Sequence, residues 1–314
     1  MEPALSRLPA DDSDGTQGKP LTAMVPPPPP RPGPAAVAVT LLGVRLDNLT
    51  QEELADHIVS SAARGAGGWM VNPNVDVLRQ IVLDPALRQL VAEADLVVAD
   101  GMPLLWAARL QGSPLRARVP VSEAVGPLCA AAAASGVGVF LLGGPDGVAE
   151  RAGKVLTDQC PGLVAAHLCP PLGFEHSEAA MAEIDQALAS AAPGIVFCAF
   201  GFPKQERLMQ VLSGRFPKTW FIGSGGTFSM VAGDTPKAPL WMSRSGLEWL
   251  HRLRLEPRRL FERYIVHDLP FTLRLLGSSA RGRFSPSSRP PSSGANGPAG
   301  RGRHPGRRED EVGG

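Results

Sequence analysis

Short apolar runs alternate with longer segments of mixed polarity through the middle of the chain. Runs of this length are typical of strands buried on both faces, and the segments between them are long enough for helices. Strands that alternate with helices predict an α/β fold, with a Rossmann-like, mainly parallel sheet flanked by helices. The predicted strands are Val37–Leu42, Trp69–Asn72, Leu96–Ala99, Val137–Leu142, Leu163–His167, Ile195–Phe200 and Trp220–Ile222.

Several helix starts carry recognisable signals. Thr50 followed by Glu53 forms a capping box, in which each residue's side chain bonds the other's backbone N–H. The pair Asp84-Pro85 places an N-cap before a proline at the first helical position. Ser122 is expected to cap a helix over residues 123–135.

Composition divides the chain into four regions. Residues 1–36 form a proline-rich tail that is expected to be disordered. Residues 37–237 hold the alternating pattern and predict one α/β domain. Residues 238–277 predict a C-terminal helical appendage, and residues 278–314 predict a second disordered tail rich in Arg, Pro, Ser and Gly.

Charge and cysteine usage exclude some classes of protein. Lys and Arg total 31 against 30 Asp and Glu, so no overall field draws the chain to nucleic acid and no nucleic-acid partner is expected. Arginines in the last tail could touch anionic lipid or RNA, although a solvated tail is the preferred interpretation. The four cysteines form no C-x-x-C pair, which favours a reducing, cytoplasmic setting. We expect no signal peptide, and the apolar stretch 128–144 predicts a helix end plus a strand rather than a membrane span.

Polar and glycine residues follow most of the predicted strands. Because the carboxyl ends of parallel strands meet at one edge of a sheet, which is where open α/β sheets bind ligands, these residues predict a binding crevice. The segments concerned are 72–76, 100–101, 143–147, 201–206 and 223–227.

Two glycine-rich loops in this crevice could bind phosphate. Gly143-Gly144 and the loop 223–226, with Gly225 and Gly226, can expose backbone N–H groups at a helix start. Tight turns without a ligand are the alternative, but two such loops in one crevice favour phosphate binding. Neither loop is a P-loop or a complete G-x-G-x-x-G, so a nicotinamide-dependent dehydrogenase is disfavoured.

One carboxylate and one arginine are the candidates for chemistry. Asp100 follows an apolar run and precedes a glycine, so it is interpreted as a general base or, alternatively, as a helix cap. The folded region lacks D-x-D, H-E-x-x-H and clustered histidines, so we expect no metal site and no cofactor. A bound diphosphate would then be neutralised by arginines such as Arg118 and by backbone N–H groups.

The appendage interleaves aromatic and aliphatic residues with arginines. A basic amphipathic helix pair of this kind can lie on an anionic membrane surface. The alternative is a helix pair docked on the sheet with its arginines in solvent, and both can hold together.

Six motifs in order resemble the WecG/TagA/CpsF glycosyltransferases, over about Val37 to Phe271. These motifs are 72–76 (NPNVD), 94–102 (ADLVVADGM), 140–144 (FLLGG), 201–206 (GFPKQE), 223–228 (GSGGTF) and 246–259 (GLEWLHRLRLEPRR). The resemblance implies an inverting, metal-independent glycosyltransferase that moves an N-acetylmannosamine-type sugar from a UDP-sugar donor to a polyprenyl-diphosphate-linked sugar acceptor. Such enzymes build cell-envelope polymers or exopolysaccharides at the inner face of the cell membrane, as peripheral proteins, and the resemblance leaves a homo-oligomer open.

The resemblance also assigns roles to residues. Asp100 matches the proposed base, Asn72, Asn74 and Gln205 match positions that line the crevice, and Arg118 matches an arginine that meets the diphosphate. The appendage matches one that closes over the site, with Arg252 and Arg259 as the arginines that reach the leaving phosphates.

Three places depart from the family pattern. Asn72 stands where threonine is usual, the segment Val121–Glu123 differs from the usual loop, and Glu262 interrupts an arginine pair. These departures bear on the choice of donor sugar or on the level of activity more than on the fold. A nucleotide-sugar-binding or scaffold protein without turnover, and an NAD-dependent oxidoreductase, are the alternative functions.

Overall fold

The computed structural model describes residues 38–236, 238–239, 241–242 and 247–283, without the side chains of residues 259 and 283. The predicted tail 1–36 and all but six residues of the predicted tail 278–314 lie outside these residues. Six parallel strands form the central sheet in the order β4-β3-β8-β7-β5-β6. They are β3 (Gly68–Val71), β4 (Leu96–Val97), β5 (Val139–Gly143), β6 (Ala165–Leu168), β7 (Ile195–Ala199) and β8 (Trp220–Gly223).

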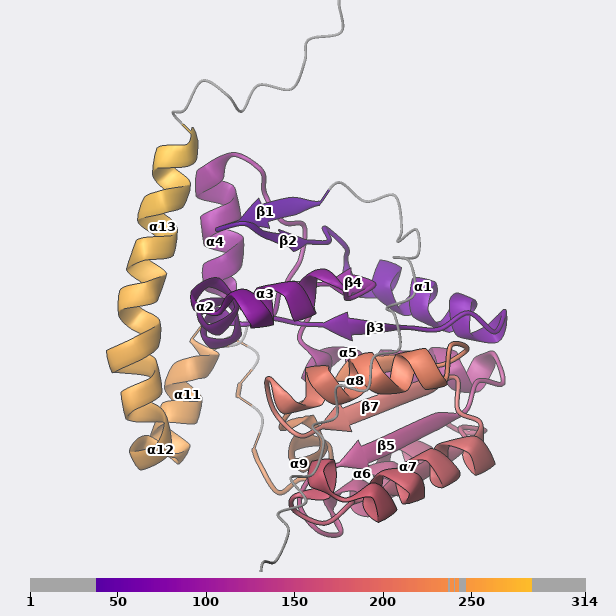
Figure 1. Ribbon diagram of the computed structural model, residues 1–314. Coiled ribbons are helices and arrows are strands. Elements are labelled where there is room, and N and C mark those ends of the chain that lie inside the picture. Colours follow the sequence, from indigo (N-terminus) through magenta and orange to yellow (C-terminus); the bar gives the residue numbers. More distant parts are fainter. Residues whose placement is uncertain (1–37, 237, 240, 243–246, 284–314) are drawn as a thin grey trace, which may run out of the picture.

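Helices cover both faces of this sheet (Figure 1). One face carries α2 (Val75–Leu83), α3 (Pro85–Ala92), α4 (Met102–Gln111), α7 (Glu178–Ala191) and α8 (Lys204–Arg215). The other face carries α1 (Gln51–Ala63), α5 (Val121–Ala134), α6 (Val148–Gln159) and α9 (Thr227–Val231). Alternate strand residues serve the two cores: Phe140 packs into the first and Leu141 into the second. This double burial explains the continuous apolar runs and confirms the predicted α/β fold.

The first predicted strand forms outside the parallel sheet. Residues of β1 (Val39–Leu41) pair in antiparallel fashion with β2 (Val44–Leu46), which the sequence analysis did not predict. Leu42 and Gly43 make the turn with φ of 49° and 81°, a left-handed pair typical of a tight hairpin. Along β1 and β2 the side chains alternate between buried and exposed, so only one face of this hairpin packs against the rest of the protein.

Two of the three predicted helix caps are confirmed. Thr50 and Glu53 exchange hydrogen bonds of 3.2 and 3.0 Å, and Asp84 accepts from the backbone N–H of Ala86 at 2.8 Å. The prediction that Ser122 caps its helix is wrong. The Pro120 carbonyl accepts the N–H groups of residues 123 and 124, so α5 begins before Ser122, at Val121.

The C-terminal appendage is helical, as expected. It comprises α11 (Glu248–Leu255), α12 (Pro257–Phe261), the π-helical η2 (Glu262–Asp268) and α13 (Leu269–Arg283). Helix α13 runs alongside α4 (Figure 1) and buries Phe271, Leu275 and Ser279. Because this packing continues past residue 277, the helix extends six residues into the region predicted as tail. No helix in the described part of the chain is long and apolar enough to cross a membrane.

Candidate active site at the carboxyl edge of the sheet

The loops that leave β3 and β4 meet at the carboxyl edge of the sheet. Asp100 follows β4, and its backbone N–H donates to the carbonyl of Pro73, which follows β3, at 3.0 Å. Gly101 has φ of 155°, and a Cβ placed there would lie 3.9 Å from Asn74. That distance is an ordinary contact, so the backbone angle rather than space favours glycine here. The turn brings Asp100 and Asn74 together, as expected for residues at one edge of the sheet.

Asp100 has an unusually high proton affinity. Burial raises its pKa from 3.8 to about 6, and the charges of Glu248 and Glu123 act in the same direction, whereas Arg118 and Arg252 oppose it. A carboxylate with a pKa near 6 is ionised at neutral pH and is a stronger base than an ordinary aspartate. Asp100 is therefore suited to take a proton from a hydroxyl group bound beside it.

Arg118 lies between two glutamates. It donates through Nη1 to Glu248 at 2.9 Å and through Nη2 to Glu123. Its side chain is only 14% exposed. Burial lowers the pKa of Arg118, but the hydrogen bond with Glu248 and the neighbouring carboxylates outweigh burial, so the pKa is raised and the guanidinium stays charged.

The appendage brings a second arginine to the same place. Arg252 on α11 pairs with Glu248 at 3.2 Å, one helical turn away, and its Nη2 lies 3.9 Å from the sulfur of Met230. Arg118 and Arg252, here called the arginine pair, thus share the Glu248 carboxylate. Arg259 lies on α12, and its side chain is outside the described residues.

Gly143 and Gly144 at the end of β5 have packing roles. A Cβ on Gly143 would lie 2.6 Å from the Phe200 ring, and one on Gly144 would lie 3.2 Å from Phe228. The N–H of Gly144 donates to the carbonyl of Ala199 at 3.0 Å. That N–H is engaged inside the fold, so phosphate binding by this loop stays a prediction that depends on its other groups.

Gly225 and Gly226 after β8 lie in a more open loop. A Cβ on either residue would meet nothing within 4 Å, and Gly225 has φ of 50°. The base of the loop is fixed by the Ser224 hydroxyl, which donates to the Cys198 carbonyl at 2.8 Å. A ligand can therefore approach this backbone closely.

Gln205 is buried at the start of α8, beside the end of β8. Its Nε2 donates to Oε1 of Glu206 at 2.8 Å and lies 2.6 Å from a Cβ built on Gly223. Burial raises the pKa of Glu206 to about 7. The Gln205 oxygen is buried without a hydrogen-bond partner, which is unusual for a buried amide.

Asn72 and Asn74 lie in the loop that leads into α2. Asn72 is half-buried directly after β3, and the Asn74 side-chain oxygen caps α2 by accepting the N–H of Val77 at 3.1 Å. The cap uses the oxygen of Asn74, which leaves its amide nitrogen for other contacts.

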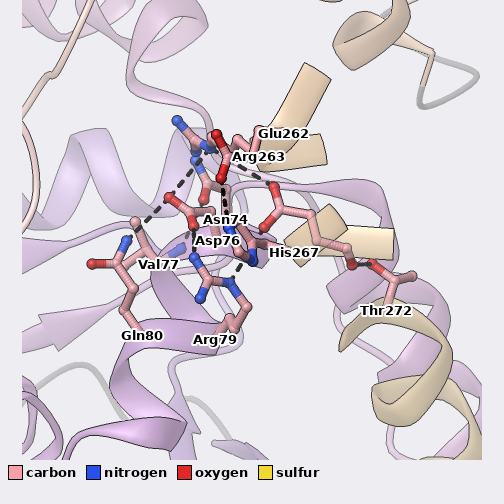
Figure 2. Close-up of polar contacts among 10 residues, drawn as sticks. Asn74, Asp76, Val77, Arg79, Gln80, Glu262, Arg263, His267 and Thr272 are labelled. Carbon is pink, nitrogen blue, oxygen red and sulfur yellow. Dashed lines mark hydrogen bonds and ion pairs between the residues drawn. The ribbon is translucent and has the colours of Figure 1, made fainter. Parts of the chain in front are cut away.

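A cluster of four charged residues connects α2 to the appendage (Figure 2). Asp76 contacts Arg79 at 2.5 Å and Arg263 at 3.2 Å, and Asp268 lies 3.6 and 3.7 Å from the same two arginines. We call these residues the anchor cluster. Burial, and then the charge of Asp76, raise the pKa of Asp268 to about 6.

A cavity of about 410 Å³ is lined by Arg252 and Glu248. Its walls come from α5, α6, α9 and α11, and they include Glu123, Glu248, His251 and Arg252. The appendage therefore leaves space next to the charged groups.

The sequence alone assigned no role to the side chains of Glu248, Glu123, Glu206 or the anchor cluster, although Asp76 and Glu206 fall in segments predicted for the crevice and Glu123 in a segment that departs from the family pattern. Glu248 lies 130 residues from Arg118 along the chain, so no local pattern could pair them. The sequence GLEWL was noted only as a motif. Among the residues that the structure describes, no group of three or more His, Cys, Asp or Glu is placed to hold a metal ion.

Comparison with known proteins identifies relatives. The family model described as glycosyl transferase WecG/TagA/CpsF family matches residues 39–285. A Staphylococcus aureus (strain NCTC 8325 / PS 47) protein is 26% identical over 224 residues, which is 71% of this chain and 86% of the relative. Its counterpart in strain MRSA252 is 27% identical over the same shares. Both are named N-acetylglucosaminyldiphosphoundecaprenol N-acetyl-beta-D-mannosaminyltransferase.

Proposed function

The chain belongs to the WecG/TagA/CpsF family of glycosyl transferases, and from this premise we propose that it transfers an N-acetylmannosamine-type sugar from a UDP-sugar to a polyprenyl-diphosphate-linked sugar. The names of the relatives support the transferred sugar and the lipid-linked acceptor. The observation that carries the proposal is Asp100, a carboxylate with a raised pKa beside two arginines at the ligand-binding edge of the sheet.

In the proposed reaction, Asp100 is the general base. The acceptor hydroxyl attacks the anomeric carbon of the donor, the bond from that carbon to UDP breaks, and Asp100 takes the hydroxyl proton. One displacement of this kind inverts the anomeric centre. The arginine pair, with Arg259, offsets the charge that develops on the departing diphosphate.

The remaining predicted residues are proposed to position the donor. Asn72, Asn74 and Gln205 offer amide groups at the carboxyl edge, and the buried, unpartnered oxygen of Gln205 is an acceptor for a ligand N–H or O–H. Gly225 and Gly226 allow the backbone to approach the phosphates closely. Gly143 and Gly144 contribute through the shape of the neighbouring turn.

We further propose that the reaction is independent of a divalent metal. The support is the arginine pair, which supplies the positive charge that Mg²⁺ would otherwise bring to a diphosphate. Transfer in the presence of excess EDTA is expected to proceed at the same rate. Loss of activity on chelation, restored by Mg²⁺ or Mn²⁺, would contradict this part.

The test is an assay for UDP release from UDP-N-acetylmannosamine with a lipid-linked N-acetylglucosamine diphosphate acceptor. Release that depends on the acceptor is the expected result. UDP binding without release would instead favour a nucleotide-sugar-binding protein without turnover, and release that is equally fast without acceptor would contradict transfer. Repeating the assay with other UDP-sugars would identify the donor. Asn72 and the segment 121–123 are expected to influence which donor is used.

We propose that the appendage docks on an anionic membrane surface, where the lipid-linked acceptor resides. Large apolar side chains lie exposed along it, beside its arginines. They are Trp249, Leu250, Leu255, Phe261, Val266, Leu269 and Leu273, and Trp241 is exposed in the segment before α11.

Docking is tested by co-sedimentation with vesicles that contain anionic phospholipid. Changing Phe261 and Leu273 to Glu is expected to weaken binding, because charge replaces apolar surface. The matched control is Leu172→Glu, since Leu172 is fully exposed but lies outside the appendage, between β6 and η1 (Phe174–His176). Equal binding by all three proteins would contradict the docking surface.

A further inference from the structure

The Glu248 carboxylate occupies the position between the two arginines of the pair. Its Oε2 accepts from Arg118 at 2.9 Å and its Oε1 lies 3.2 Å from Arg252. One anion therefore bridges two guanidinium groups, one from the α/β domain and one from the appendage. A diphosphate would make the same kind of bridge, because its oxygens accept from guanidinium groups in the same geometry.

The two arginines cannot neutralise both the Glu248 carboxylate and a bound diphosphate. Arg118 and Arg252 supply two positive charges, while Asp100, Glu123 and Glu248 supply three carboxyl groups within electrostatic reach of one another. A diphosphate that entered this cluster would add further negative charge to a partly buried place, where repulsion between like charges is costly. One carboxylate must then leave the arginines or take up a proton.

Glu248 is the carboxylate best placed to leave. It belongs to α11, a helix that buries none of its residues, whereas Glu123 lies on α5, which packs firmly on the sheet. Glu248 lines the cavity of about 410 Å³, as Glu123 does, so the side chain has space to turn into, and what distinguishes Glu248 is its loosely held helix.

We infer that Glu248 is an internal stand-in for the donor diphosphate: it holds Arg118 and Arg252 in converging positions while the site is empty, and the diphosphate displaces it on binding. This inference rests on the proposed function. Glu248 is thus a positioning residue, which acts through the arginine pair, and it competes with the donor for the same guanidinium groups. Binding of the diphosphate exchanges an internal ion pair for an external one.

The test compares UDP binding by the full-length protein and its variants, with isothermal titration calorimetry. Glu248→Gln keeps the shape of the side chain and removes the competing charge, so UDP is expected to bind on the order of fivefold more tightly. Glu183→Gln removes the same charge from an exposed position of α7, outside the site, and is expected to leave the Kd unchanged. Weaker or unchanged UDP binding by Glu248→Gln would overturn the inference, because a simple brace would weaken the site when removed.

A second comparison shows whether the effect acts through the arginines. In an Arg118→Ala background, Glu248→Gln is expected to give no further gain, since half of the bridge is already absent. A gain that persists there would overturn the inference. Glu248→Asp, whose shorter carboxylate cannot span both arginines, provides an independent variant with an expected gain of smaller size.

The outcomes also separate the inference from the proposed function. If the unmodified protein does not bind UDP, the proposed function fails, and the inference fails with it. If the unmodified protein binds UDP and Glu248→Gln binds no more tightly, the inference alone fails.

Discussion

Helices α13 and α11 belong to the same appendage but contact the rest of the protein in different ways. Helix α13 lies along α4 and buries Phe271 and Leu275, whereas α11 buries no residue. An ion pair between Glu248 and Arg118 links α11 to the α/β domain. Salt does not screen apolar packing, whereas it screens in part an ion pair whose carboxylate, like that of Glu248, is about a quarter exposed. The comparison indicates that α13 is a fixed support and that α11 can exchange its contact for a ligand.

The largest expected effect on activity comes from replacing Asp100, the proposed base, which lies near the arginine that α11 contacts. Asp100→Asn removes the proposed base and is expected to lower kcat by about 10²-fold or more. The fold should persist, because the neutral amide replaces a carboxylate that burial disfavours. Steady-state kinetics of UDP release checks the rate, and circular dichroism checks the fold. Asp158→Asn, an exposed change on α6, is the control; equal rates in both variants would reject Asp100 as the base.

Shortening a leucine side chain in α13 should lower the stability far more than shortening one in α11. Leu275→Ala leaves a cavity under a fully buried side chain and is expected to lower the free energy of unfolding by about 2 kcal/mol. Leu250→Ala on α11 removes a side chain that is 45% exposed, so its effect should stay below about 0.5 kcal/mol. Urea denaturation measures both. Equal losses would show that α11 is as firmly packed as α13.

Salt should change amide hydrogen exchange in α11 but not in α13. Raising the ionic strength screens the bond between Arg118 and Glu248, so amide hydrogen exchange in α11 is expected to accelerate by about twofold to fivefold. Exchange in α13 should remain unchanged. Hydrogen exchange read by mass spectrometry checks this, and parallel acceleration in both helices would mean that the appendage opens as one body.

The anchor cluster predicts a smaller, pH-dependent effect. The pKa of Asp268 is raised to about 6 in the folded protein, above its ordinary value of 3.8. The folded state therefore binds the proton more tightly, and the stability contributed by this group is lost as pH rises from about 4 to about 6. The stability of Asp268→Asn, relative to that of the unmodified protein, should consequently be higher at pH 7.5 than at pH 4.5. Thermal unfolding at both pH values tests this sign, and a difference that does not change with pH would contradict it.

The sequence predicted the sheet well because its strands are buried on both faces. The runs around Phe140 and Val196 have no polar interruption, and such runs in alternation with helices leave few other folds. The hairpin β1–β2 was misplaced because a single run, without its partner strand, carries no information about direction. The pairing depends on the turn at Leu42-Gly43, where a leucine with positive φ is not a recognisable turn signal.

The meeting of loops at the carboxyl edge of the sheet could be predicted from the sequence, but not the side-chain contacts formed there. Parallel strands bring their carboxyl ends together, which is why Asp100 and Asn74 meet. The bonds of Arg118 to Glu248 and of Arg263 to Asp76 depend on how the appendage lies on the domain, and each joins residues far apart in the chain. The loop at Gly144 was predicted to bind an anion, but the Gly144 N–H donates to the carbonyl of Ala199 in the neighbouring strand β7. A glycine-rich pattern alone does not show which N–H groups are free.

The most direct test of the central claim is the pH profile of kcat/KM for the donor, which reports the ionisation of the free enzyme. With Asp100 as the base and a pKa of about 6, the value should rise about tenfold per pH unit below pH 6 and level off above it. A profile that is already level at pH 5 would contradict the account, because an ordinary aspartate, or no base at all, would then be sufficient.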